Sequence, residues 1–166
     1  ADREYSSAVT RKDPIVTNTH VDYYSADLSL RPSSESARYK VRLMNAVLDR
    51  IESIAAASKT PILLMFIPHP ADLSDSYDWG KPDPKLYPEY AERNLIEPLE
   101  QFATRRGVPF VSLFDAFKAS EPNSLYLHGG DDHWNAAGQK LAAQLVADQI
   151  VTTGLGSSSG TAPTGR

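Results

Sequence analysis

The sequence predicts an α/β domain of three layers, in which helices cover both faces of a parallel sheet. Helix-like and strand-like segments alternate between residues 33 and 153, and this alternation is typical of parallel sheets with helices on both sides. The clearest strand, Ile62–Ile67, is apolar at every position, as expected of a strand buried on both faces. Because the pattern shows only two strands, we expect the sheet to be incomplete in this chain.

The first regular element expected is a long helix. Residues 1–32 are polar and aperiodic, and only Pro14–Thr17 resembles a strand, so this segment is predicted to be irregular. Residues 34–58 are predicted to be helical because serine caps precede apolar residues at helical spacing. These apolar residues are Val41, Leu43, Met44, Val47, Leu48, Ile51, Ile54 and Ala55. Pro61 and Pro68 then bracket the strand Ile62–Ile67.

A long loop and a second helix come after the first strand. Residues 68–87 show no periodicity, and a loop of about 20 residues either covers a site or is an excursion from the domain. Residues 88–106 are helical in pattern. Pro98 is expected to kink this helix or to mark its first turn, and Gly107 is expected to end it.

A second strand and a final helix complete the domain. Val108–Leu113 is predicted to be a strand, and Asp115 is expected to cap a short helix after it. Asn135 is expected to cap a last helix that ends near Gly154. Residues 154–166 are rich in Gly, Ser and Thr, so they are predicted to be a disordered tail. Residues 33–153 are therefore the predicted domain.

Composition narrows the possible partners. The chain has 166 residues, 41% of them hydrophobic, and a net charge of -4, which suits one ordinary domain. Its 17 basic residues form no cluster, so nucleic acid is not an expected partner. The run Ile62–Ile67 is far shorter than the roughly 20 residues that cross a bilayer. Without cysteine, disulfides, thiolate metal sites and cysteine nucleophiles are excluded.

The candidate catalytic residues lie just before the last predicted helix. Residues 127–138 read Leu-His-Gly-Gly-Asp-Asp-His-Trp-Asn-Ala-Ala-Gly. A histidine becomes a general base when a carboxylate holds one of its ring nitrogens. In a tight turn Asp131 can fold back toward the imidazole of His133, whereas the adjacent Asp132 points away. The pattern therefore indicates His133 as a base and Asp131 as its orienter.

Two other interpretations of this loop stay open. Glycine and aspartate are common turn residues, so the loop can be an ordinary turn with a solvated histidine. The loop can also hold a divalent metal ion through His128, Asp131, Asp132 and His133. Four ligands within six residues converge on one ion with difficulty, which disfavours the metal site.

Three residues outside the loop are candidate contacts for a substrate. His69 stands between two prolines just past the first strand, where ligands approach parallel sheets. Trp79 and Tyr87 can stack on a sugar ring. A solvated histidine and two aromatic rings packed against the loop are the ordinary alternatives. Trp134 is expected to pack beside His133 and fix its ring.

The pattern Asp-x-His-Trp-Asn-x-x-Gly at residues 131–138 resembles the last conserved block of the SGNH (GDSL-like) hydrolases, in the form seen in alginate O-acetyltransferase-like relatives. The resemblance extends more loosely over residues 33–152 and implies a flavodoxin-like fold. It also implies serine ester chemistry without a cofactor, with His133 as the base and Asp131 as its partner. Hydrolysis of acyl or acetyl esters and O-acetyl transfer to a polysaccharide are both implied, and a periplasmic or secreted location is favoured.

Two features depart from that family pattern. Most members place the acid three residues before the histidine, where this chain has Gly130. No glycine precedes Gly80, so residues 1–79 hold neither a Gly-Asp-Ser turn nor an oxyanion-hole glycine. We therefore expect the nucleophilic serine on a segment N-terminal to this chain, and the chain alone to be inactive. A non-catalytic binding or structural domain is the remaining alternative.

Overall fold

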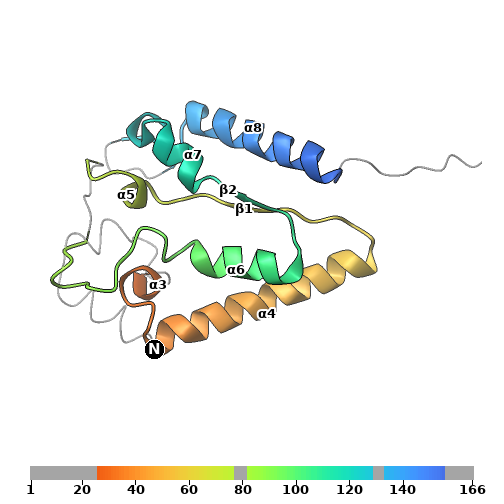
Figure 1. Cartoon of the computed structure of the whole chain (residues 1–166), viewed down its shortest axis with the longest axis horizontal. Coiled ribbons are helices and arrows are strands. Elements are labelled where there is room, and N and C mark those ends of the chain that lie inside the picture. The colour runs from red at the N-terminus through yellow and green to blue at the C-terminus, as the bar shows by residue number, and fades with distance from the viewer. Residues whose placement is uncertain (1–25, 77–81, 129–132, 156–166) are drawn as a thin grey trace, which may run out of the picture.

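The described part of the chain is a mixed α/β fold around a small parallel sheet (Figure 1). The computed structural model describes residues 26–76, 82–128 and 133–155. Its elements, in chain order, are α3 (Ala26–Leu30), α4 (Glu35–Ala57), β1 (Leu64–Phe66), α5 (Pro70–Leu73), α6 (Glu97–Arg106), β2 (Phe110–Ser112), α7 (Phe114–Ala119), the 3-10 helix η1 (Pro122–Ser124) and α8 (Ala136–Thr153).

The two described strands pair in parallel, as the sequence predicts. Met65 of β1 lies opposite Val111 of β2, and the amide of Leu113 extends the ladder by donating to the carbonyl of Phe66 at 3.2 Å. Both strands are shorter than the expected ranges 62–67 and 108–113. Proline lacks an amide hydrogen for the ladder; Pro109 directly precedes β2, and Pro61 and Pro68 lie within three residues of the ends of β1.

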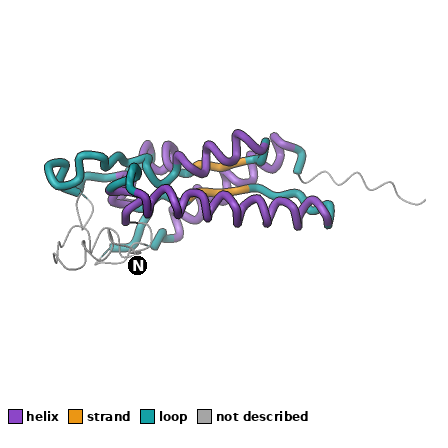
Figure 2. The backbone as a smooth tube through the Cα atoms, turned by 90° about the horizontal axis from the view of Figure 1, so that it is seen from below, coloured by secondary structure: helices purple, strands orange, loops and turns teal. Residues whose placement is uncertain are grey.

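Helices lie on both sides of the two strands. In Figure 1, α7 and α8 lie on one side and α6 and α4 on the other. Figure 2 shows that the long helices and the strands run roughly along the same axis. Within the described residues, no helix is both long enough and apolar enough to cross a bilayer.

The largest hydrophobic core gathers around β2, α7 and the start of α8. Its buried members are Leu73, Ile96, Val111, Leu113, Phe114, Phe117, Leu125, Tyr126 and Ala142. Trp134, Leu141, Leu145 and Val146 pack against them with partly buried side chains. The segment that precedes α8 is thereby anchored in the core.

Helix α4 matches the predicted range but is poorly covered. The side chain of Ser34 caps it by accepting a hydrogen bond from the amide of Ala37 at 3.1 Å. Among its residues only Ala37 and Ala55 are buried. Five large side chains on this helix are 46–57% exposed, and we call them the α4 stripe: Tyr39, Leu43, Val47, Ile51 and Ile54.

The structure corrects the predicted secondary structure of three segments. The segment 68–87, expected to lack regular structure, contains α5, which begins where the proline after His69 fits the first turn of a helix. Residues 88–96 form turns, and the helix begins only at α6. Pro98 thus marks its first turn, because the missing amide hydrogen costs nothing there. The range 1–32, predicted irregular, includes α3.

Asp115 is not the cap of α7. The cap position is Leu113, whose side chain makes no capping hydrogen bond, and the amide of Phe114 instead donates to the hydroxyl of Ser112 at 3.3 Å. Asp115 instead lies in the first turn, where its carboxylate meets Arg93. The final helix is confirmed, because Asn135 caps α8 and Gly154 ends it with a φ of 68°. The predicted strand Pro14–Thr17 and residues 156–166 of the predicted tail lie outside the described residues.

Candidate functional site

His133 stands in a short antiparallel pairing that we call the histidine hairpin, made of residues 125–127 and 133–135. Tyr126 and Trp134 form its central bridge. The amide of Leu127 donates to the carbonyl of His133 at 2.8 Å, and the amide of Asn135 donates to the carbonyl of Leu125 at 2.9 Å. These bonds hold the backbone of His133 beside that of Leu127, just before α8.

His133 is exposed although its neighbours in the hairpin are held in the core. Tyr126 and Leu125 are buried members of the hydrophobic core, and Trp134 packs against it. Leu127 is 43% exposed, and His133 is exposed as well. Trp134 therefore anchors the backbone beside His133, and His133 itself is open to solvent.

The histidine hairpin lies at the carboxyl end of β1. The hydroxyl of Tyr126 donates to the carbonyl of Pro68 at 2.5 Å, and Pro68 comes two positions after the last residue of β1. Ligands of parallel sheets bind beyond the carboxyl ends of the strands. His133 is thus in the part of the fold where such a site is expected.

The Asn and Gly of the motif fix the hairpin to α8. Asn135 accepts hydrogen bonds from the first turn of α8 at 2.8 and 3.2 Å. Its amide group also donates to the carbonyls of Ser124 at 2.8 Å and Tyr126 at 3.1 Å. A Cβ atom on Gly138 would lie 2.6 Å from the carbonyl oxygen of Leu125, so a larger residue there would push the hairpin from the helix.

His69 also lies at the end of β1, where it caps α5. Its Nδ1 accepts a hydrogen bond from the amide of Ala71 at 3.2 Å. In a neutral imidazole that accepts through Nδ1, the proton is on Nε2, and this second nitrogen of His69 is itself buried. Its ring is partly buried.

Helix α5 also carries a buried carboxylate, which a tyrosine contacts. Asp72 is 2% exposed and accepts a hydrogen bond from the hydroxyl of Tyr90 at 2.7 Å. Burial, followed by the charge of Asp72, raises the pKa of Tyr90 well above its usual range. Tyr87, a candidate for stacking on a sugar, is 4% exposed and packs with Leu30, which is the packing alternative.

The metal interpretation is not tested by the described residues. His128 is exposed, and its Nε2 lies 2.9 Å from the carbonyl oxygen of Asn123. In the part of the chain that the structure describes, no group of three or more histidines and carboxylates is placed to hold a metal ion. Asp131 and Asp132, and with them the orienter proposed for His133, lie outside the described residues, as does Trp79.

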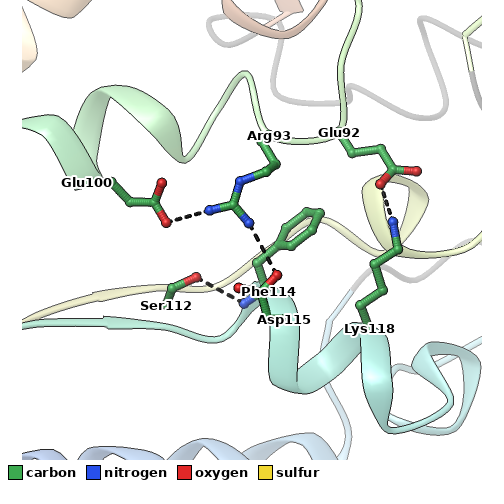
Figure 3. A network of polar contacts seen from close by, with 7 residues as sticks. All are labelled: Glu92, Arg93, Glu100, Ser112, Phe114, Asp115 and Lys118. Carbon is green, nitrogen blue, oxygen red and sulfur yellow. Dashed lines mark hydrogen bonds and ion pairs between the residues drawn. The ribbon is translucent and has the colours of Figure 1, made fainter.

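A network of polar contacts joins the turns before α6 to α7 (Figure 3). Arg93 donates to Glu100 at 2.6 Å and to Asp115 at 3.2 Å, and its guanidinium lies 5.1 Å from the centre of the Phe114 ring. The hydrogen bond to Glu100 is the main cause of the raised pKa of Arg93. The side chain of Asp115 is 81% exposed. We assign Asp115 a structural contact rather than a catalytic one.

Tyr126 is the residue of this site that the sequence did not single out. Its neighbours Leu125 and Leu127 make the segment alternate only weakly, and nothing local indicates Pro68 as its partner. Comparisons with protein-family models, with curated proteins and with solved structures found no match. Function is therefore inferred from the residues of the histidine hairpin and from their placement.

Proposed function

We propose that the chain is part of a serine ester hydrolase of the SGNH type, acting on acyl or acetyl esters. His133 is the general base, and Asp131 holds its second ring nitrogen. The nucleophilic serine comes from polypeptide outside the described residues. In this proposal the base removes the serine proton during attack on the ester carbonyl and then returns it to the leaving alcohol.

The placement of His133 carries the proposal. An exposed imidazole on a hairpin anchored by Tyr126 and Trp134 stands beyond the carboxyl end of a parallel strand. A general base needs both access to substrate and a backbone that does not move. An ordinary solvated turn needs neither the buried anchors nor the hydrogen bond from Tyr126 to Pro68.

The sheet itself supports a larger three-layer, flavodoxin-like fold. Leu64 and Phe66 use their backbone groups to pair with β2, so in a parallel ladder the amide and carbonyl of Met65 face the opposite edge. No strand of the described residues pairs with that edge. Parallel sheets occur almost entirely with both faces covered and with more strands than two.

The exposed α4 stripe supports a further strand at the same edge of the sheet. Helix α4 leads into β1, and connections between parallel strands are right-handed in nearly all proteins. A strand that precedes α4 and pairs with β1 would therefore lie beneath this helix. We propose that further strands cover the α4 stripe and bring the serine toward His133.

The first test is ester hydrolysis by the full-length protein, measured with a short-chain p-nitrophenyl ester. Loss of a general base lowers the rate about 10²- to 10⁴-fold, so His133→Ala should reduce kcat by that factor. The matched control is His128→Ala, which removes a second histidine of the same loop, one that contacts the carbonyl of Asn123, and it should keep kcat within about threefold because His128 has no part in the proposed Ser-His-Asp group. Undiminished turnover in His133→Ala would contradict the proposal.

The same assay separates the alternatives. A metal site would make both histidine variants inactive and the wild-type protein sensitive to EDTA. Transfer rather than hydrolysis would place labelled acetate on an added polysaccharide instead of releasing it. A non-catalytic domain would show no turnover with any ester.

A further inference from the structure

We propose that Tyr126 is a positioning residue, whose hydroxyl fastens the histidine hairpin to the carboxyl end of β1 and so sets where His133 stands. The contact joins residues 58 positions apart in the sequence. Its catalytic meaning rests on the function proposed above. The positioning itself is a property of this chain.

The contact of Tyr126 is built to be firm. The side chain is 2% exposed, and its hydroxyl donates to the carbonyl of Pro68 at 2.5 Å. A hydrogen bond shielded from water is electrostatically stronger than one in solvent. The ring itself is held at its other side by Phe117, in an edge-to-face contact with centroids 6.0 Å apart.

The backbone bonds of the hairpin and the side-chain bonds of Asn135 do not reach β1. Leu127 pairs with His133 inside the hairpin. Asn135 joins the hairpin to the start of α8 through its cap bonds and to η1 through the carbonyl of Ser124. These bonds fix the hairpin to its neighbours along the chain. The hydrogen bond of the Tyr126 hydroxyl connects the hairpin to the carboxyl end of β1, where the candidate site lies.

The position of the hairpin relative to β1 determines whether His133 can act as a base. The imidazole has to lie within hydrogen-bond reach of the group that it deprotonates. A misplacement of about 1 Å costs about 10²-fold in rate. His133 immediately precedes Trp134, which pairs with Tyr126 in the hairpin. A shift of the hairpin away from β1 therefore moves the imidazole with it.

The test compares two tyrosine variants of the 166-residue chain. Tyr126→Phe keeps the ring and removes only the hydroxyl. Tyr90→Phe is the control, because it deletes the same atom from a partly buried hydrogen bond, the one to Asp72, which lies outside the hairpin. The readouts are amide hydrogen exchange at Leu127 and Asn135 and the ring resonances of His133 in NMR spectra.

We expect exchange at Leu127 and Asn135 to quicken at least tenfold in Tyr126→Phe and the His133 resonances to shift. In Tyr90→Phe both should stay within twofold of the wild type. Exchange at Leu145, inside α8, reports global opening and corrects both variants for lost stability. If Tyr126→Phe disturbs the hairpin no more than Tyr90→Phe does, the positioning role is wrong.

A measurement on the wild type guards against a variant that fails to fold. The hydroxyl proton of Tyr126 should exchange slowly enough to give an NMR signal, because it is buried and bonded. Rapid exchange of this proton with water would overturn the proposal, whatever the variant does.

Activity of the full-length protein adds the catalytic readout. Tyr126→Phe should lower kcat about 10- to 100-fold, with KM within about twofold, since a base is displaced and substrate binding is kept. If His133→Ala keeps full activity, the proposed function fails and the exchange result stands by itself. If His133 is required but Tyr126→Phe has wild-type kcat, only the positioning role fails.

Discussion

The two longest helices in the described part of the chain differ greatly in how much of their apolar surface is covered. Helix α8 places Ala142 in the core, and Leu141, Leu145 and Val146 pack around it. Helix α4 is longer, yet its stripe of five large apolar side chains remains about half exposed. Single exposed apolar residues are ordinary, but a contiguous apolar surface marks an interaction site.

The apolar surface of the described residues is better covered on the α8 side than on the α4 side. On the α8 side, core, hairpin and helix cap support one another, and this side carries His133. On the α4 side, α3 supplies a contact, in which Lys40 binds the buried Asp27 at 2.7 Å. The exposed α4 stripe indicates that another segment should cover it. The stripe does not identify that segment.

The largest loss of stability is expected for a substitution in the core beside α8. Phe117 is fully buried, and removal of a buried Phe side chain costs about 3–5 kcal/mol. Phe117→Ala should lower the free energy of unfolding by that amount in urea titrations followed by circular dichroism. Val47→Ala on the α4 stripe is the control, with an expected loss below about 1 kcal/mol because half of that side chain is already in water. Equal losses would remove the contrast between the two sides.

The next effect is expected where the hairpin meets α8. Gly138→Ala puts a Cβ atom 2.6 Å from the carbonyl oxygen of Leu125, and such overpacking typically costs about 1–3 kcal/mol. Gln139→Ala, the exposed neighbour, should change stability by less than about 0.5 kcal/mol. The same urea titrations measure both. A neutral Gly138→Ala would show that hairpin and helix are not in firm contact.

The caps of the two helices provide a matched pair. Loss of a side-chain cap costs about 1 kcal/mol, and this is the expected effect of Ser34→Ala at the start of α4. Asn135→Ala should cost about 2 kcal/mol, since it also breaks the hydrogen bonds to Ser124 and Tyr126. Thermal unfolding of the two variants gives the difference. If both lose the same stability, the hairpin bonds of Asn135 contribute nothing.

The smallest effect in this chain is expected on the α4 stripe. Ile51→Gln should change stability by less than about 0.5 kcal/mol, as surface substitutions usually do. In the full-length protein, where we propose that strands cover the stripe, loss of a buried Ile should cost about 2–5 kcal/mol. Val151→Gln on α8, at a side chain 81% exposed, should be neutral in both proteins. Equal behaviour of Ile51→Gln in the two proteins would contradict the proposed covering.

Local sequence patterns were sufficient to predict the two long helices and the first strand. The periodicity and caps of α4 and α8 predicted their bounds closely, and the apolar run at 62–67 predicted a strand of a parallel sheet. Asp115 shows the limit of such patterns. An aspartate near the start of a helix can cap it or sit in its first turn, and here Arg93, 22 residues away, is the partner of its carboxylate.

The sequence was enough to predict a candidate base before a capped helix, because the chemistry of His133 and the cap of Asn135 depend on neighbours within a few positions. The exposure of His133 and the contacts that hold its backbone could be learned only from the packing of distant segments. Tyr126 and Pro68 meet only when β1 and the hairpin are packed on one core. The same packing leaves the α4 stripe exposed, since coverage of a helix face depends on distant chain segments that periodicity does not record.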